Sequence, residues 1–191
     1  QAISEIAQFA FGAAALQIDH FVTPFFELAA GLVSVSAIAL LYALLSLRLL
    51  WPRIALPVIA YAPLMALASL DVAVTLARPL EHGGWWAWPI ALAVHALVLW
   101  RLAPSWPAAA RNAVHAIGVL VIALLGALQG RALTIDWGDA MSAWGWLGWL
   151  VVPALLLMLL PRHGLSRRWP VSAAPVAYRW IAAALLAAGL L

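Results

Sequence analysis

Apolar residues along this chain come in blocks of about twenty, separated by short segments that hold most of the charged residues. A bilayer core requires about 20 consecutive apolar residues per helix, so each block is long enough to cross a membrane. The pattern predicts five complete spans, at residues 25–50, 54–77, 85–102, 108–130 and 141–160. Residues 2–18 and 176–191 are also apolar, and we expect a partial span at each end of the chain.

Each span is expected to be a helix, because a helix satisfies its own backbone hydrogen bonds in lipid, which offers none. The connections are short, which makes successive helices antiparallel neighbours. The predicted fold is an all-α polytopic transmembrane helical bundle, and residues 1–191 form one transmembrane domain. Gln1 is not an initiator residue and the chain stops within an apolar stretch, so we expect a segment of a longer polytopic protein.

The composition excludes several classes of function. The chain is 67% apolar and 9% charged, whereas a soluble domain is about one-quarter charged, and it contains no cysteine. Disulfides, thiolate metal sites and cysteine nucleophiles are therefore absent. The net charge of +3 comes from ten arginines dispersed among the connections rather than gathered in one basic stripe, which argues against nucleic-acid binding.

The arginines also predict the orientation, because connections kept in the cytoplasm carry the excess of positive charge. Alternate connections are arginine-rich, and we assign them to the cytoplasmic side of a bacterial inner membrane. The arginines of this side are Arg48, Arg53, Arg101, Arg111, Arg162, Arg167, Arg168 and Arg179. The opposite side holds Arg78, Arg131 and most of the acidic residues.

The segment "EHGGWWAWP" lies where the third predicted span begins on the outer side. A tryptophan ring with one N–H donor is best accommodated at the boundary between lipid and water. We therefore interpret Trp85, Trp86 and Trp88 as an interfacial anchor, with the two preceding glycines forming a tight turn.

Two histidines are candidate metal or haem ligands. His95 and His115 lie at matching depths, about 10 Å from the inner ends of the third and fourth predicted spans. Two antiparallel helices would bring the imidazoles face to face, where they could bind haem b or a metal, or relay protons. The alternative is that each histidine only hydrogen-bonds a neighbouring helix or faces a small aqueous pocket. No third ligand or haem motif accompanies the pair, so no cofactor is predicted.

Acidic residues on the outer side are candidates for substrate contact. Asp71 lies within the second predicted span with Arg78 and His82 nearby in sequence, and Glu27 opens the first span. A carboxylate inside a membrane is costly and commonly functional. Asp71, Glu27 and His82 are therefore candidate acid–base residues. Candidate substrate-binding residues of the same face are Arg78, Glu81, Asp136 and Asp139. The alternative is an Asp71–Arg78 salt bridge and a solvated loop around Asp136.

Small residues in the fourth predicted span, Gly118, Gly126 and Gly130, favour close helix packing, and the last two have GxxxG spacing.

The segments "GGWWAWPIALAVHALVLWRL", "RNAVHAIGVLVIALL" and "WPVSAAPVAYRW" resemble a bacterial membrane-protein family known as domain of unknown function 2339. The resemblance covers residues 40–185 and rests on Gly83, Gly84, Trp85, Trp88, Pro89 and His95. It implies a protein with many spans, and it implies no activity or catalytic residue.

Three functions are compatible with these features. The leading hypothesis is a non-enzymatic component that scaffolds or handles an envelope lipid or glycan at the acidic outer face. Its partners would be membrane lipids, and other membrane subunits or a lipid-linked glycan. The second hypothesis is a membrane-embedded enzyme acting on a lipid-linked substrate, and the third is a subunit that binds haem or a metal through His95 and His115.

Overall fold

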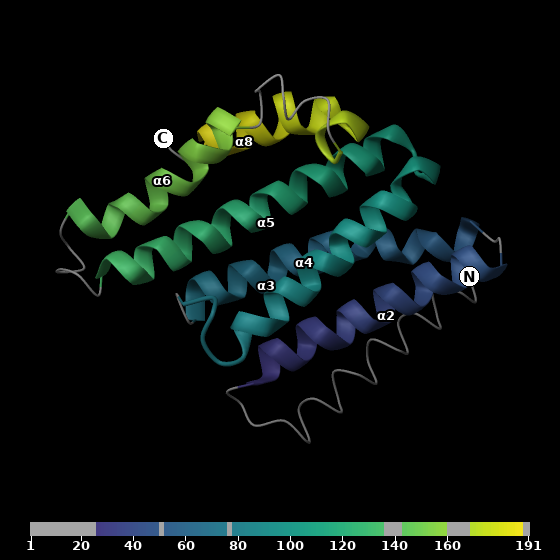
Figure 1. Cartoon of the computed structure of the whole chain (residues 1–191), viewed down its shortest axis with the longest axis horizontal. Helices are drawn as coiled ribbons and strands as arrows, with labels where there is room; N and C mark the ends of the chain where they lie inside the picture. The colour runs from purple at the N-terminus through teal and green to yellow at the C-terminus, as the bar shows by residue number, and fades with distance from the viewer. Residues whose placement is uncertain (1–25, 50–51, 76–77, 136–142, 160–168, 189–191) are drawn as a thin grey trace. The chain divides into compact units, whose positions relative to one another are not determined.

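The computed structural model describes residues 26–49, 52–75, 78–135, 143–159 and 169–188. Within these residues every regular element is a helix (Figure 1). The longer helices are α2 (Glu27–Leu49), α3 (Tyr61–Thr75), α4 (Gly84–Arg101), α5 (Ala108–Ile135) and α6 (Ala143–Leu159). The shorter ones are the 3₁₀ helices Pro52–Ala60, Ala103–Ser105 and Val171–Ala173, the π-helix η5 (Ala177–Ala182), and α8 (Ala183–Ala188). The predicted all-α class is confirmed for this part of the chain.

In the described part of the chain, three helical stretches are long and apolar enough to cross a membrane: Glu27–Leu49, Leu56–Thr75 and Ala108–Ile135. They coincide with the first, second and fourth predicted spans. The other two predicted spans also form helices, α4 and α6, but neither belongs to this set. Tryptophans, His95 and Arg101 reduce the hydropathy of α4, and α6 has 17 described residues. The chain thus has the helices of a membrane protein.

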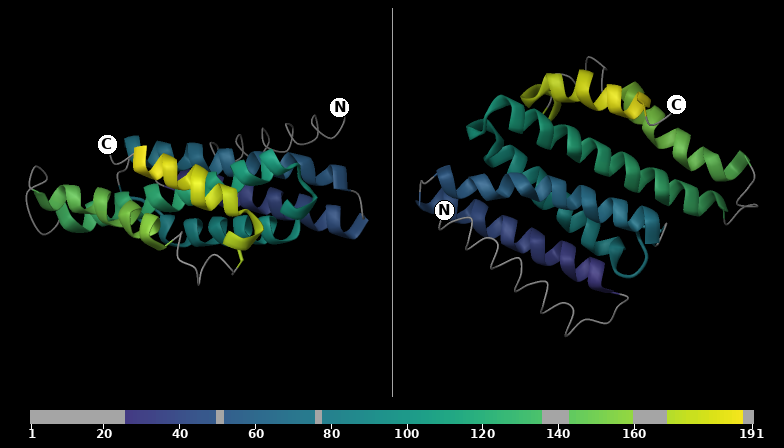
Figure 2. Two further views of the ribbon diagram at one scale, coloured as in Figure 1. Left: turned by 90° about the horizontal axis from the view of Figure 1, so that it is seen from above. Right: turned by 180° about the vertical axis from the view of Figure 1, so that it is seen from behind.

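The chain folds as two compact units, which are described separately. The first contains Gln1–Ala68 and Leu80–Trp106, and the second contains Ser69–Pro79 and Pro107–Leu191. Helix α3 contributes its first half to the first unit. In that unit α2 packs against α4, and the two run in the same direction while α3 runs in the opposite direction (Figures 1 and 2).

A tight turn joins Pro79 to α4 and fixes the start of that helix. His82 and Gly83 have φ angles of 50° and 84°, in the left-handed region that favours glycine. The amides of Gly84 and Trp85 close the turn on the carbonyls of Glu81 and Leu80, at 2.8 and 3.1 Å. A Cβ on Gly83 would lie 3.0 Å from Ala29 Cβ. The turn therefore needs glycine at 83 both for its φ and for contact with α2, whereas Gly84 is already helical.

In the second unit α5 and α6 lie side by side and antiparallel, and η5 and α8 pack on them (Figure 1). Their shared apolar core includes Val119 and Ala123 of α5, Tyr178 and Ala182 of η5, and Leu186 of α8. Alanine at these contacts lets the helices approach closely, which in a membrane is the main source of attraction between them.

Glycines bring α5 and α6 together. A Cβ on Gly130 would lie 3.1 Å from Gly148 Cα, and one on Gly126 would lie 2.7 Å from a methyl group of Val152. A Cβ on Gly148 would overlap the backbone of Gly130 and Arg131. The prediction that Gly126 and Gly130 lie at a close helix contact is confirmed, and Gly148 is the partner that the GxxxG pattern did not reveal.

Replacing Gly148 with alanine should destabilise the second unit. The added methyl group meets backbone atoms of α5, which cannot rotate away as a side chain can, so we expect a cost of about 1–3 kcal/mol. Thermal unfolding in detergent measures this as a lower midpoint. Gly31→Ala is the matched control, because a Cβ there meets nothing within 4 Å. Equal midpoints for the two variants would contradict the contact.

Candidate functional site

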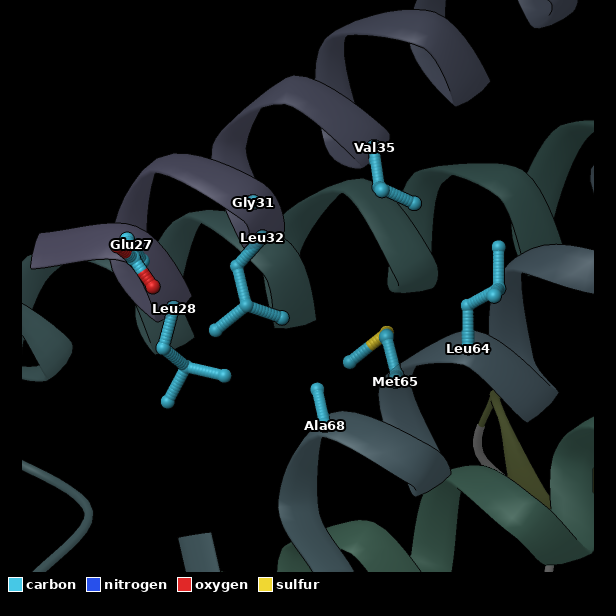
Figure 3. Close-up of a pocket in the computed structure, with 8 residues that line it drawn as sticks. All are labelled: Glu27, Leu28, Gly31, Leu32, Val35, Leu64, Met65 and Ala68. Atoms are coloured by element: carbon cyan, nitrogen blue, oxygen red, sulfur yellow. The ribbon is translucent and has the colours of Figure 1, made fainter. Parts of the chain in front are cut away.

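A pocket of about 250 Å³ opens in the first unit between α2 and the first half of α3. Figure 3 shows Leu28 and Leu32 of α2 pointing toward Met65 and Ala68 of α3, with Glu27 at one end. The remaining lining residues are Gly31, Val35 and Leu64. Apart from Glu27 the side chains of this lining are apolar, so the walls suit hydrocarbon and offer little to water.

Small residues create the space. On α2 the pocket residues recur at three- and four-residue spacing, which places them on one face of the helix. A Cβ on Gly31, in the middle of that face, would meet nothing within 4 Å. Ala68 on α3 is also too small to fill the gap. The pocket is therefore the result of two short side chains among longer ones.

Glu27 is the one charged residue among the described residues that line the pocket. It is the first residue of α2, where the helix dipole stabilises a negative charge. Its side chain is exposed at the end of the helix, and no ion pair of Glu27 occurs among the described residues. The carboxylate can thus accept hydrogen bonds from a bound molecule. Charge-assisted hydrogen bonds of this kind are stronger than neutral ones.

A network of buried polar groups crosses the first unit next to the pocket. Ser36 Oγ lies 2.6 Å from the carbonyl oxygen of Leu32, a pocket residue, and 2.7 Å from the Tyr61 hydroxyl. The Tyr61 hydroxyl in turn lies 2.9 Å from the carbonyl oxygen of Ala91. The network links α2, α3 and α4, and both Ser36 and Tyr61 are almost fully buried.

Two hydroxyl protons serve the three oxygen contacts of this network, so only two contacts can be hydrogen bonds at one time. If Tyr61 donates to Ala91, then Ser36 donates either to Leu32 or to Tyr61. If Tyr61 instead donates to Ser36, then Ser36 donates to Leu32. In the first arrangement Tyr61 hydrogen-bonds α3 to α4. In the second arrangement the hydrogen bond between Tyr61 and Ser36 joins α3 to α2, and α4 is not bonded.

His95 lies beside this network. Its ring centroid is 6.2 Å from that of Tyr61, and its side chain is buried in the first unit. His115 belongs to the second unit, so the structure does not bring the predicted histidine pair into one compact unit. No group of three or more histidine, cysteine or acidic side chains able to hold a metal occurs in the described ranges.

His115 has a different partner. Its Nδ1 lies 2.8 Å from the hydroxyl of Tyr178 on η5, with the two rings edge to face. Both side chains are buried. His115 therefore joins α5 to η5, as the helix-bonding alternative predicted. Leaving a buried ring nitrogen unpaired costs about 1–3 kcal/mol, and His115 Nε2 has no hydrogen-bond partner in the described part of the chain.

The outer acidic candidates are divided between the units. Asp71 lies four residues before the end of α3, in the second unit, and its side chain is exposed. Arg78 also belongs to the second unit, whereas Glu81 and His82 belong to the first, as does Glu27. The 81–84 turn packs against the start of α2, since a Cβ on Gly83 would lie 3.0 Å from Ala29 and 3.2 Å from Phe26. Asp136 and Asp139 lie outside the described residues.

The three tryptophans of the predicted anchor differ in exposure. Trp85 is 68% exposed, as an interfacial side chain must be, and Trp86 is half-buried. Trp88 is only 2% exposed, so it contributes to the packing of the first unit. The anchor stays a prediction, for which Trp85 and Trp86 have the exposed surface.

Ser36, Tyr61 and Tyr178 were not among the predicted site residues. Each is a hydroxyl within an apolar span, and a polar group in such a span needs a partner on a neighbouring helix. That signal was available in the sequence, although the identity of the partner was not.

No family model, curated protein or solved structure matches this chain. The resemblance to domain of unknown function 2339 stays a prediction.

Tyr61→Phe should weaken the first unit by about 1 kcal/mol, the usual net value of a buried hydrogen bond. The change removes the hydroxyl that links Ser36 to Ala91 and retains the ring. Tyr42→Phe is the matched control, because Tyr42 is buried in the same unit and no hydrogen bond of its hydroxyl occurs in the described part. Thermal unfolding in detergent compares the two variants. An unchanged midpoint for Tyr61→Phe would show that the network contributes no stability.

Proposed function

We propose that this protein is a non-enzymatic membrane component that binds one envelope lipid at the outer face of a bacterial inner membrane. The hydrocarbon tail occupies the pocket between α2 and α3, and Glu27 contacts the headgroup. The observation that carries the proposal is an apolar pocket of about 250 Å³ whose described lining has one carboxylate, that of Glu27 at its end.

The proposed topology has five complete spans with partial spans at both ends of the chain, and α4 and α6 cross the membrane together with the three longer helices. The distribution of arginines supports an orientation in which α2 begins at the outer face. Glu27 then lies at the outer end of the pocket, at the level of lipid headgroups.

The size and chemistry of the pocket support a tail as its occupant. An apolar cavity of about 150 Å³ is large enough to remain dry and to bind benzene, and this pocket is larger. Hydrocarbon gains little by leaving other lipid, so binding depends on shape and packing against the walls rather than on the hydrophobic effect. Gly31 and Ala68 supply that shape.

The charge of Glu27 supports a headgroup with a primary ammonium group. Such a headgroup both neutralises the carboxylate and donates a hydrogen bond to it. A quaternary ammonium group offers the charge without the donor, and an anionic phosphatidylglycerol headgroup lacks the ammonium charge. We therefore expect phosphatidylethanolamine to bind more tightly than phosphatidylcholine or phosphatidylglycerol.

The enzyme hypothesis has less support. Acid–base chemistry commonly uses two titratable groups near one substrate, and Glu27 is the one titratable residue among the described residues of the pocket lining. Asp71, the predicted partner in catalysis, is not among the described residues that line the pocket. Lipid binding needs one headgroup contact and an apolar wall, which the pocket has.

Glu27→Gln should lower the retention of phosphatidylethanolamine about tenfold. The variant keeps the shape of the side chain and removes its charge, and a tenfold change corresponds to about 1.4 kcal/mol, within the range of a charged hydrogen bond. The measurement is native mass spectrometry of the protein released from nanodiscs that contain equal amounts of phosphatidylethanolamine and phosphatidylcholine.

Three further variants separate binding of the headgroup from binding of the tail. Glu81→Gln removes an outer carboxylate that does not line the pocket, and retention should be unchanged. Gly31→Leu fills the pocket and should reduce retention of both lipids, whereas Ala37→Leu on the exposed part of α2 should not. Equal retention in Gly31→Leu and Ala37→Leu would remove the pocket as the binding site.

A further inference from the structure

The first turn of α5 carries a positive charge, Arg111, at the positive end of the helix dipole. The amides of a helix N-terminus give it a partial positive charge, and an acidic residue commonly offsets it. Helix α5 has no acidic residue in its first turn, and Arg111 lies in that turn. The helix dipole disfavours a cation at this position. No side chain of the first turn therefore neutralises the charge of Arg111.

His115 lies one turn after Arg111, on the same face of α5. Its side chain is 1% exposed. Because Cα–Cβ bonds in a helix tilt toward the N-terminus, the imidazole lies over the turn that contains Arg111. The two side chains therefore share one patch of the helix surface, and Tyr178 Oη lies 2.8 Å from His115 Nδ1.

The Tyr178 contact determines which ring nitrogen of His115 carries the proton. The contact with Nδ1 is the one hydrogen bond that the described residues offer to the Tyr178 hydroxyl. A hydroxyl proton is satisfied only if it is donated to an acceptor. Donation from Tyr178 to Nδ1 leaves one unpaired group, Nε2–H, whereas donation from Nδ1–H would leave both the hydroxyl proton and Nε2 unpaired in the described part of the chain. We therefore assign the hydroxyl as the donor, with the proton of a neutral His115 on Nε2.

His115 Nε2–H is consequently a buried donor without a partner in the described part of the chain, and Arg111 Nε–H is a second one. Both donors lie on one face within one turn of each other, beside a positively charged helix end. A single anion with several acceptor oxygens would satisfy both donors and offset the charge. Phosphate has this chemistry, and Ala108–Ile135 is long enough to span the membrane, so its first turn lies near lipid headgroups.

We infer that Arg111 and His115, with Tyr178 fixing the imidazole, form a binding site for the phosphate of an anionic lipid headgroup at the start of α5. Arg111 supplies the charge and one donor, and His115 supplies the second donor. Tyr178 is a positioning residue, because it acts through the tautomer of His115. The site lies wholly in the second unit and does not depend on the α2–α3 pocket.

The test uses the whole protein in nanodiscs of phosphatidylcholine with one-quarter phosphatidylglycerol, and native mass spectrometry counts the retained phosphatidylglycerol. Arg111→Gln should lower retention about tenfold. Arg179→Gln is the matched control, since it removes the same charge from an exposed position beside Tyr178. Equal losses in the two variants, or none in either, would overturn the site.

A second measurement needs no charge variant. In protein labelled with ¹⁵N-histidine, the Nε2 resonance of His115, assigned with His115→Gln, should shift when phosphatidylglycerol replaces phosphatidylcholine. Tyr178→Phe should reduce the shift, because without the hydroxyl the proton of His115 is no longer restricted to Nε2. No shift in the native protein would overturn the proposal. The same shift on adding inorganic phosphate to phosphatidylcholine discs would overturn the lipid headgroup as the occupant and assign the site to a free anion.

Discussion

Polar groups inside a lipid bilayer must find partners within the protein, and this constraint organises both units of the structure. In the first unit the hydroxyls of Ser36 and Tyr61 meet between α2 and α3 and reach the backbone of α4 at Ala91. In the second unit the His115–Tyr178 contact joins α5 to η5. Each contact lies among apolar side chains that could pack in many ways. The polar contacts distinguish one arrangement from the others, because a shift of one turn would leave buried hydroxyls unpaired.

Small residues have opposite effects in the two units. Gly148 of α6 faces Gly130 of α5 so closely that neither position has room for a Cβ, and the backbones meet. Gly31 of α2 faces open space, and the pocket forms there. Glycine by itself therefore predicts neither a contact nor a cavity. Whether a contact or a cavity forms depends on the residue that the neighbouring helix places opposite the glycine. Gly130 of α5 meets the backbone of Gly148, whereas the small side chain of Ala68 on α3 leaves space near Gly31.

The sequence predicted most of the helices, because apolar blocks of membrane length leave little choice of secondary structure. Finer features depended on tertiary contacts. The second predicted span begins as the 3₁₀ helix Pro52–Ala60 and becomes α-helical only at Tyr61. Glu27 was recognised as a candidate by its charge, whereas the pocket beside it required knowing which face of α2 meets α3. Matching depth predicted that His95 and His115 would pair, and this stays a prediction because they belong to different units. The tyrosine beside each histidine could not be predicted, because depth does not determine direction around a helix.

The most direct test of lipid binding is a cryo-EM structure of the protein in nanodiscs of phosphatidylethanolamine, at a resolution that separates acyl chains from side chains. The proposed function predicts continuous rod-like density between α2 and α3, passing Leu32 and Met65 and ending in headgroup density within hydrogen-bond distance of the Glu27 carboxylate. A pocket that contains no lipid density, or that is filled by another segment of the protein, would contradict it.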